Sequence, residues 1–212
     1  MCAWSAPSRS CGSLVGSPDE DALRGPEILS GARLRRRANP DTTSRRIRPA
    51  RRYSALVGHD SFKIGTLPAG IAAASEMILR SVPEWFGIES ALLGYVKASE
   101  EWPTWFAIAG EAPIGFITIH THFRESAEIH CIAARPEWHR RGVGRALVRH
   151  AEGVLRVQGV RFLQVKTLSP RRACEHYDRT REFYLAMGYV PLEEFPLLWD
   201  ERNPALQLVK AL

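Results

Sequence analysis

The middle of the chain, residues 127–147, reads AEIHCIAARPEWHRRGVGRAL. Its first seven residues are mostly apolar, which is typical of a central β-strand. Apolar residues then recur at helical intervals from Ala146 to Leu155, which predicts a long helix over residues 145–157. A glycine-containing loop lies between the two. The segment therefore reads as a strand, a glycine loop and a helix.

The loop has the composition of an anion site. The first backbone N–H groups of a helix have no acceptor within the helix and carry the positive end of its dipole. Gly142 and Gly144 remove side chains that would keep a phosphate from these amides. Arg140, Arg141 and Arg145 add charged donors. The ligand that suits such a loop is a pyrophosphate.

Two familiar phosphate loops do not match this segment. A Walker A loop requires GxxxxGK followed by Ser or Thr, which the chain lacks. A Rossmann fingerprint requires a third glycine, and Leu147 stands in its place. The alternative to a phosphate site is a helix start whose glycines serve only close packing.

Strand and helix patterns surround this central unit. Before it we expect a short strand from residue 62, a helix from residue 68, a helix over 89–96, and a hairpin of strands over 105–109 and 114–120. After it we expect a strand over 162–167, a helix over 180–187, and strands over 189–192 and 205–209. This order predicts an α/β domain over residues 61–212, with a mixed central sheet flanked by helices.

The overall composition narrows the class of protein. The 212 residues are 45% hydrophobic and 25% charged, as in globular proteins, which excludes wholesale disorder and collagen-like repeats. No apolar run reaches the roughly 20 residues of a membrane helix. The four cysteines have no CxxC spacing, so we expect neither a structural zinc nor a disulfide framework, and a cytoplasmic protein without a metal.

The net charge of +6 is concentrated at the N-terminus. Residues 1–60 contain 11 Arg and 6 acidic residues, whereas residues 61–212 have a net charge of only +1. The first 60 residues are also rich in Ser, Pro and Gly and have no apolar period, which predicts a basic, disordered extension. It is either a dispensable extension, with a start assigned too far upstream, or an arm that binds nucleic acid.

Two segments carry a resemblance to a known family. Residues 127–147 resemble the acetyl-CoA-binding motif of the GNAT superfamily of N-acetyltransferases: Gln or Arg, two residues, Gly, one residue, then Gly or Ala. Gly142 and Gly144 take the two small positions, and His139 stands where Gln or Arg is usual. Residues 180–189, TREFYLAMGY, resemble the family's FYxxxGF segment, with Tyr189 for the last Phe. The family's occasional Asn before this segment is Tyr177 here, so its contact is not carried over.

The resemblance covers about residues 61–212 and implies a GNAT-type acyl-CoA N-acyltransferase fold. It implies an enzyme that transfers the acetyl group of acetyl-CoA, its co-substrate, to a primary amine by direct attack in a ternary complex. Homodimers are common in the family. The cofactor-binding residues that the resemblance implies are Ile132, Ala133 and Ala134 through their backbone, and His139, Arg140, Arg141, Gly142, Val143, Gly144 and Arg145 in the loop.

The reaction sets the catalytic candidates. An ammonium must lose a proton before it attacks a thioester, and the departing thiolate benefits from an acid. Glu128 resembles in position the glutamate base of some family members; its alternative role is a salt bridge. His130 shares a strand face with Glu128 and is the second candidate. By resemblance, Tyr184 is the acid that protonates the sulfur of coenzyme A, and core packing is its alternative role. Further carboxylates to consider are Glu84, Glu89 and Glu125.

The acceptor is a small-molecule or peptide amine that the sequence does not identify. Trp85, Phe86, Trp102 and Trp105 either line its pocket or belong to the core. Two other functions stay open. One is an acyl-CoA-binding module of the same fold without catalysis, and the other is nucleic-acid binding through the basic extension. We expect no membrane partner.

Overall fold

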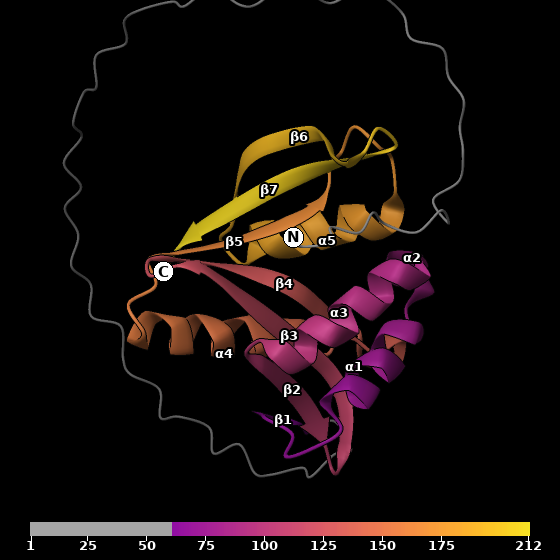
Figure 1. Ribbon diagram of the computed structural model, residues 1–212, viewed down its shortest axis with the longest axis vertical. Helices are drawn as coiled ribbons and strands as arrows, with labels where there is room; N and C mark the ends of the chain where they lie inside the picture. The colour runs from indigo at the N-terminus through magenta and orange to yellow at the C-terminus, as the bar shows by residue number, and fades with distance from the viewer. Residues whose placement is uncertain (1–60) are drawn as a thin grey trace, which may run out of the picture. The chain divides into compact units, whose positions relative to one another are not determined.

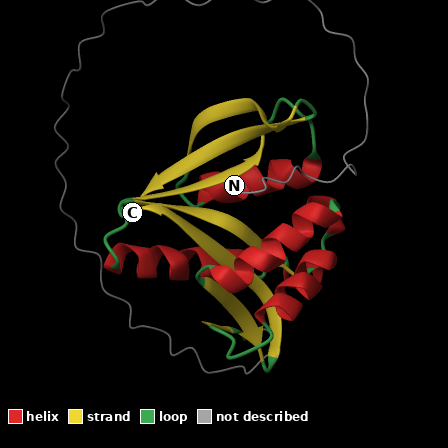
Figure 2. Ribbon diagram, in the orientation of Figure 1, coloured by secondary structure: helices red, strands yellow, loops and turns green. Residues whose placement is uncertain are grey.

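The structure, a computed structural model, describes residues 61–212, so the predicted extension over residues 1–60 lies outside the described residues. The described chain contains both helices and strands, as Figures 1 and 2 show. In order they are β1 (Lys63–Gly65), α1 (Ile71–Arg80), α2 (Pro83–Phe86), α3 (Glu89–Glu101), β2 (Thr104–Ala109), β3 (Ala112–Phe123), β4 (Ser126–Ala134), the 3-10 helix η1 (Pro136–Trp138), α4 (Val143–Val157), β5 (Phe162–Leu168), α5 (Glu175–Ala186), β6 (Val190–Asp200) and β7 (Asn203–Ala211).

The strands form one mixed sheet. Their order across the sheet is β1-β2-β3-β4-β5-β7-β6. All neighbours are antiparallel except β4 and β5, which run parallel. A parallel pair needs a crossover connection, and α4 is that connection. The predicted mixed sheet with flanking helices is therefore confirmed.

Alternate residues of β2 pack into two separate cores. Phe106 and Ile108 join a cluster with buried residues of α1 and α3, such as Ile78 and Leu92. Ala107, which points to the other side of the sheet, joins a cluster with buried residues of α4. The two faces of the sheet are thus covered by different helices, with α1 and α3 on one and α4 on the other.

Helix α4 has the apolar face that the sequence predicts. Leu147, Val148 and Ala151 are buried against the sheet, whereas Arg145 and Arg149 are exposed. The helix begins at Val143, because Gly142 before it has a φ of 85°, in the left-handed region outside the helical range. The predicted helix is therefore confirmed and starts two residues earlier.

Several elements are longer than the sequence predicts, among them α3, which continues to Glu101, and β3, which runs over Ala112–Phe123. Helix α5 begins at Glu175, five residues before the expected start. Strand β6 continues to Asp200, beyond the expected end at residue 192. It is an edge strand that pairs only with β7, and its apolar side chains, such as Leu192 and Leu197, are exposed. An exposed edge strand lacks the apolar alternation from which strands are predicted. Among the described residues, no helix is long and apolar enough to cross a membrane.

Candidate active site

Strands β4 and β5 separate before either of them ends. Their ladder runs from Ser126 opposite Phe162 to Ile129 opposite Val165, whereas β4 continues to Ala134 and β5 to Leu168. A wedge-shaped gap therefore opens in the middle of the sheet, at the carboxyl ends of its two parallel strands.

A bulge in β4 lies where the strands part. Strand β3 pairs Ile119 with Ile129 and Thr118 with Cys131, so His130 is an extra residue without a counterpart. Such a bulge bends the strand and increases its twist. It also turns two consecutive side chains to the same side: His130 contacts Tyr95 of α3, and Cys131 belongs to the core formed with α1 and α3.

The edge of β4 in the gap carries backbone donors. The amide of Arg135 donates to the carbonyl of Ile114 on β3, at 2.8 Å. Amides of successive residues in a strand point to opposite sides. The amides of Ile132 and Ala134 therefore point away from β3 and toward the gap, where an added extended chain can pair with them.

The glycine loop follows this edge directly. The ring of His139 holds the loop closed, since its Nε2 lies 2.8 Å from the carbonyl oxygen of Ala134. Arg140 and Gly142 both have positive φ, 62° and 85°, and they turn the chain into α4. No side chain caps the start of α4, so its first amides are open to a ligand. The predicted loop thus has the geometry of an anion site.

The charged and small residues of the loop fit a polyanion. Arg140, Arg141 and Arg145 are exposed around the helix start, and Arg141 lies 5.5 Å over the ring of Trp138. A Cβ on Gly142 would meet no atom within 4 Å, which leaves the space before the amides empty. A Cβ on Gly144 would lie 3.4 Å from the ring of Phe183, so the helix start and α5 are adjacent.

Tyr184 reaches the site from α5. The residue is 3% exposed, and its ring contacts those of Phe183 and Tyr189. Burial raises the pKa of the Tyr184 phenol, and the neighbouring Cys131 and Tyr177 raise it further. The phenol therefore keeps its proton at neutral pH, as a proton donor must.

Glu128 lies in a network of three donors. It is 2% exposed, and its Oε2 lies 2.7 Å from Nζ of Lys166, 2.8 Å from Nε2 of His122 and 3.1 Å from Nε2 of Gln164. No described residue hydrogen-bonds its Oε1. Glu128 is thus in the salt bridge that was one of its two alternative roles, and its role as the base stays a prediction.

Aromatic rings and imidazoles surround the carboxylate. Trp102 stacks on His120 with ring centroids 4.0 Å apart, and its edge meets His130 at 4.6 Å. Burial lowers the pKa of His130 from 6.5 to about 4, so this imidazole is neutral at pH 7. Tyr95 packs against His130 from α3.

Helix α2 connects the glycine loop with α5. Trp85 donates from Nε1 to the hydroxyl of Thr180, and the phenol of Tyr177 donates to the carbonyl of Trp85, at 3.1 and 3.3 Å. The indole also meets the rings of His139 and His176 edge to face. Trp85 therefore touches both elements that carry the resemblance.

The other aromatic and acidic candidates lie in different parts of the fold. Phe86 packs with α1 and α3, whereas Trp105 packs with α4 and contacts His150, on the opposite face of the sheet from His130. Glu89 pairs with Arg80 in an exposed bidentate contact. The carbonyl of Glu125 accepts the amides of residues 161 and 162. Trp105 is therefore not among the side chains near Glu128.

Several residues of this site were not predicted. Lys166 and Gln164 alternate on β5, His120 and His122 alternate on β3, and Tyr95 belongs to α3. The alternation alone puts each pair on one strand face. The two strand pairs lie beside Glu128 because β4 lies between β3 and β5, and this strand order is a property of the tertiary fold.

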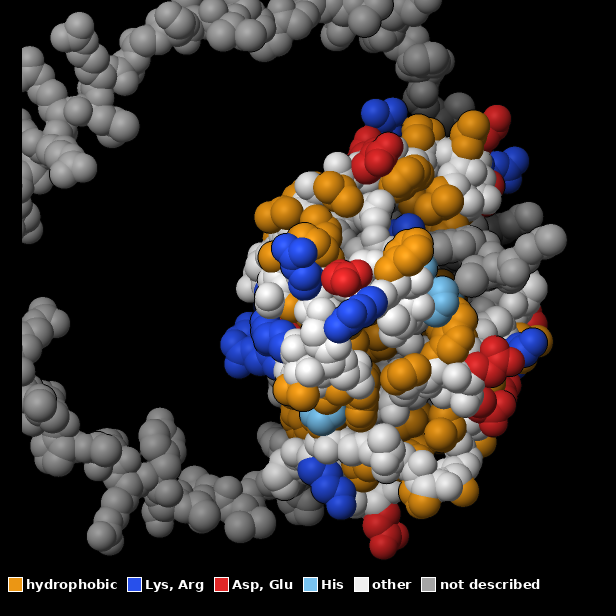
Figure 3. All heavy atoms as spheres, turned by 60° about the vertical axis from the view of Figure 1, so that its left-hand side comes forward, with side chains coloured by type: hydrophobic (Ala, Val, Ile, Leu, Met, Phe, Trp, Pro, Cys, Tyr) orange, Lys and Arg blue, Asp and Glu red, His pale blue; other side chains and the backbone are white. Residues whose placement is uncertain are grey.

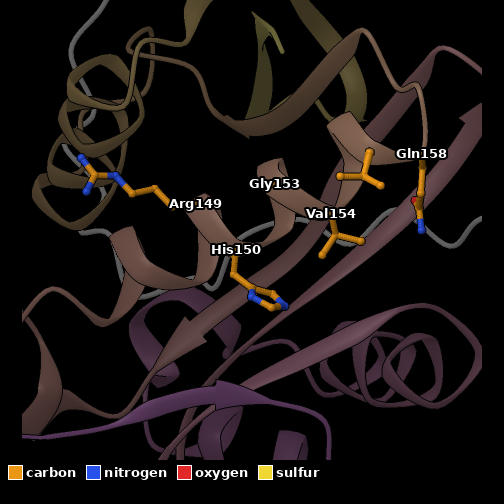
Figure 4. A pocket seen from close by; sticks show the side chains of 6 residues that line it. Arg149, His150, Gly153, Val154 and Gln158 are labelled. Atoms are coloured by element: carbon orange, nitrogen blue, oxygen red, sulfur yellow. The ribbon is translucent and has the colours of Figure 1, made fainter.

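A hollow elsewhere on the surface contains none of the predicted residues. It lies on the outer side of α4 and is lined by Arg149, His150, Gly153, Val154, Val157 and Gln158 (Figure 4). On the face drawn in Figure 3, basic side chains are scattered among apolar and acidic ones. No group of His, Cys, Asp and Glu among residues 61–212 is arranged to hold a metal ion.

Known structures share this architecture. The chain is similar to Ard1 from Thermoplasma volcanium, with 18% identity, 71% of this chain and 97% of that chain covered and a TM-score of 0.60. It is similar to the ribosomal-protein-S18-alanine N-acetyltransferase from Escherichia coli, with 16% identity, 71% of this chain and 94% of that chain covered and a TM-score of 0.58. It is also similar to the aminoglycoside 6'-N-acetyltransferase from Enterococcus faecium, with 19% identity, 70% of this chain and 96% of that chain covered and a TM-score of 0.54. At these identities the likeness shows the fold.

No curated protein matches the chain. The model of the Acetyltransferase (GNAT) family matches residues 75–189, which include the parted strands, the glycine loop, α4 and Tyr184. The chain therefore belongs to the GNAT family of acetyltransferases.

Proposed function

We propose that the protein is an acetyl-CoA-dependent N-acetyltransferase that acetylates a primary amine by direct attack in a ternary complex. The observation that carries the proposal is the early parting of β4 from β5. Within residues 61–212 it leaves the amides of Ile132 and Ala134 unpaired, directly beside the uncapped start of α4. The free edge of β4 thus offers donors for an extended amide-containing arm, and the start of α4 next to it offers donors for a diphosphate.

The loop residues supply the charge that such a co-substrate needs. The first amides of α4, at Val143, Gly144 and Arg145, face the diphosphate, and the guanidinium groups of Arg140 and Arg141 approach it from solvent. His139 contributes through the loop, because its ring is bonded to the carbonyl of Ala134. Acetyl-CoA supplies a thioester, whose acetyl carbon is open to attack by an amine.

Glu128 and Tyr184 are the proposed catalytic pair. A base at this carboxylate, either Glu128 itself or a group hydrogen-bonded to it, receives the proton that the acceptor ammonium loses, directly or through water. Tyr184 then gives its phenolic proton to the departing sulfur, a role that suits a buried tyrosine whose pKa is raised. The phenol regains a proton from the acetylated nitrogen through solvent, so the acceptor loses two protons, of which the thiol keeps one.

Binding and turnover test the proposal separately. Calorimetry on the full-length chain is expected to show binding of coenzyme A and of acetyl-CoA and weaker or no binding of ATP and NAD. Release of free thiol from acetyl-CoA is then followed with a panel of amines. The panel includes peptides with an N-terminal alanine and aminoglycosides, because similar structures are named for an S18 alanine and for aminoglycosides.

The outcomes distinguish the alternatives. Absence of coenzyme A binding by folded protein would contradict the whole proposal. Binding without thiol release for any amine would favour the non-catalytic acyl-CoA-binding module. Homodimers are common in the family that the chain resembles, and light scattering on the full-length chain tests for one.

A further inference from the structure

The protonation state of His122 follows from its partner. Oε2 of Glu128 accepts hydrogen bonds from the ammonium of Lys166 and the amide of Gln164, at 2.7 and 3.1 Å. The third contact on this oxygen is Nε2 of His122, at 2.8 Å. An ionised carboxylate only accepts hydrogen bonds, so Nε2 carries the hydrogen. In the neutral imidazole, Nδ1 is then the basic nitrogen.

The carboxylate of Glu128 is already engaged by its neighbours. Its Oε2 takes part in three contacts, with His122, Gln164 and Lys166. Protonation of Glu128 would also remove the negative charge that faces the ammonium of Lys166, whose side chain is only 11% exposed. A proton that arrives at this cluster is therefore better placed on a neighbouring base.

The nearby imidazoles differ in their ability to take it. Burial lowers the pKa of His130 to about 4, and burial together with the charge of His122 lowers the pKa of His120. The charge of Glu128 offsets part of this lowering for both rings, but among the described residues neither ring is hydrogen-bonded to a carboxylate. His122 is, since its Nε2 lies 2.8 Å from Oε2 of Glu128, and its side chain is 25% exposed, so the ring also reaches water.

We propose that Glu128 and His122 act as a carboxylate–histidine pair, in which Nδ1 of His122 takes the proton of the acceptor ammonium. The inference rests on the proposed function and identifies the base within it. The N–H bond of the ammonium breaks, its electron pair stays on nitrogen as the nucleophile, and the proton bonds to Nδ1, directly or through one water. Glu128 stays ionised and orients the ring, and the imidazolium releases its proton to solvent from the exposed side.

The charged and titratable groups that face His122 set the expected pH dependence. Glu128 of β4 favours the imidazolium, whereas Lys166 of β5 opposes it. His120, whose ring centroid is 4.4 Å away on β3, and His130 of β4 add no charge while they are neutral. Protonated His122 cannot take the proton, so kcat/KM is expected to fall on the acidic side, over the range in which imidazoles titrate.

The test combines a pH–rate profile with a binding-independent measurement. His122→Gln keeps an N–H toward Oε2 of Glu128 and removes only the basic nitrogen. We expect it to lower kcat/KM at neutral pH about a hundredfold and to abolish the acidic limb of the profile. His150→Gln, on α4 and on the other face of the sheet from His130, is the matched control and is expected to keep both rate and profile.

Nuclear magnetic resonance follows the imidazole C–H signals of the full-length chain with pH. The signal that disappears in His122→Gln belongs to this ring, and its titration is expected to change in Glu128→Gln because the carboxylate contact is lost. A His122 that stays neutral down to pH 5, or an unchanged acidic limb in His122→Gln, would overturn the proposal. If no amine supports turnover, the proposed function fails, and the dependence of the His122 titration on Glu128 still decides whether the pair exists.

Discussion

The ammonium of Lys166 lies 2.7 Å from Oε2 of Glu128 at the point where the two central strands part. Val165, the residue before Lys166, is the last residue of β5 paired with β4. The two side chains are 11% and 3% exposed, so this ion pair is shielded from water. It ties β4 to β5 where the ladder ends, next to the gap.

Removing one member of this pair is expected to destabilise the fold. Lys166→Met leaves a buried carboxylate without its cation, which costs about 3 kcal/mol in free energy of unfolding. Urea denaturation followed by circular dichroism measures the loss. The double variant Lys166→Met/Glu128→Gln should lose at least about 1 kcal/mol less free energy of unfolding than the two single variants lose in sum. Strictly additive losses would mean that the two side chains do not interact in solution.

The conformation of Gly142 predicts a selective effect on binding. At a φ of 85°, an alanine is strained by about 1 kcal/mol, so Gly142→Ala should lower the stability by this amount. Relief of that strain moves the loop, and we expect binding of coenzyme A to weaken about tenfold in calorimetry.

Gly153 provides the control within the same helix. It lies inside α4, and a Cβ there would meet no atom within 4 Å. Gly153→Ala should therefore raise the stability by about 0.5–1 kcal/mol and leave the affinity for coenzyme A unchanged. Equal affinity in the two variants would count against a role of the loop in binding.

Tyr184 can be tested without disturbing the core. Tyr184→Phe keeps the buried ring and removes only the phenolic proton, so kcat should fall about a hundredfold while the affinity for coenzyme A is kept. Steady-state kinetics and calorimetry measure the two quantities. Tyr189→Phe is the matched control, because the Tyr189 phenol donates to Glu152 rather than toward the gap. Full activity of Tyr184→Phe would exclude the phenol as the acid.

His130 makes the stability depend on pH. Its pKa is lowered by burial from 6.5 to about 4 in the folded chain, so between these values the unfolded chain binds more protons. Stability is therefore full above pH 6.5 and falls as the pH is lowered toward 4. Between pH 7 and pH 5 the loss from this group is about 2 kcal/mol.

Urea denaturation at the two pH values measures this loss. His130→Gln should flatten the dependence without abolishing it, since the pKa of His120 is lowered in the same direction. A steeper decline in His130→Gln than in the wild type would contradict the assignment.

Much of the fold could be read from local sequence. The strand over residues 126–134 and the helix over 143–157 are long, strongly patterned and joined by glycines, so their existence and their order were predictable. The edge strand β6 was underestimated because its side chains face solvent, and α5 because its first turns are polar and carry little apolar pattern.

Some residues of the candidate site could likewise be predicted from local sequence and others could not. The loop residues, Glu128 and Tyr184 lie within two short motifs, and a resemblance could therefore point to them. Lys166 and His122 belong to other strands, 38 and 6 residues away from Glu128 in the chain, and no local pattern connects them to it.

The sequence by itself determined the elements, the glycine loop and the family, because turn chemistry and apolar period act between near neighbours. Only the tertiary structure decided which strands flank β4, where β5 leaves it, and which donors meet at the Glu128 carboxylate. Those facts depend on strand order and on the bulge at His130, which arise when segments distant in the chain pair and pack.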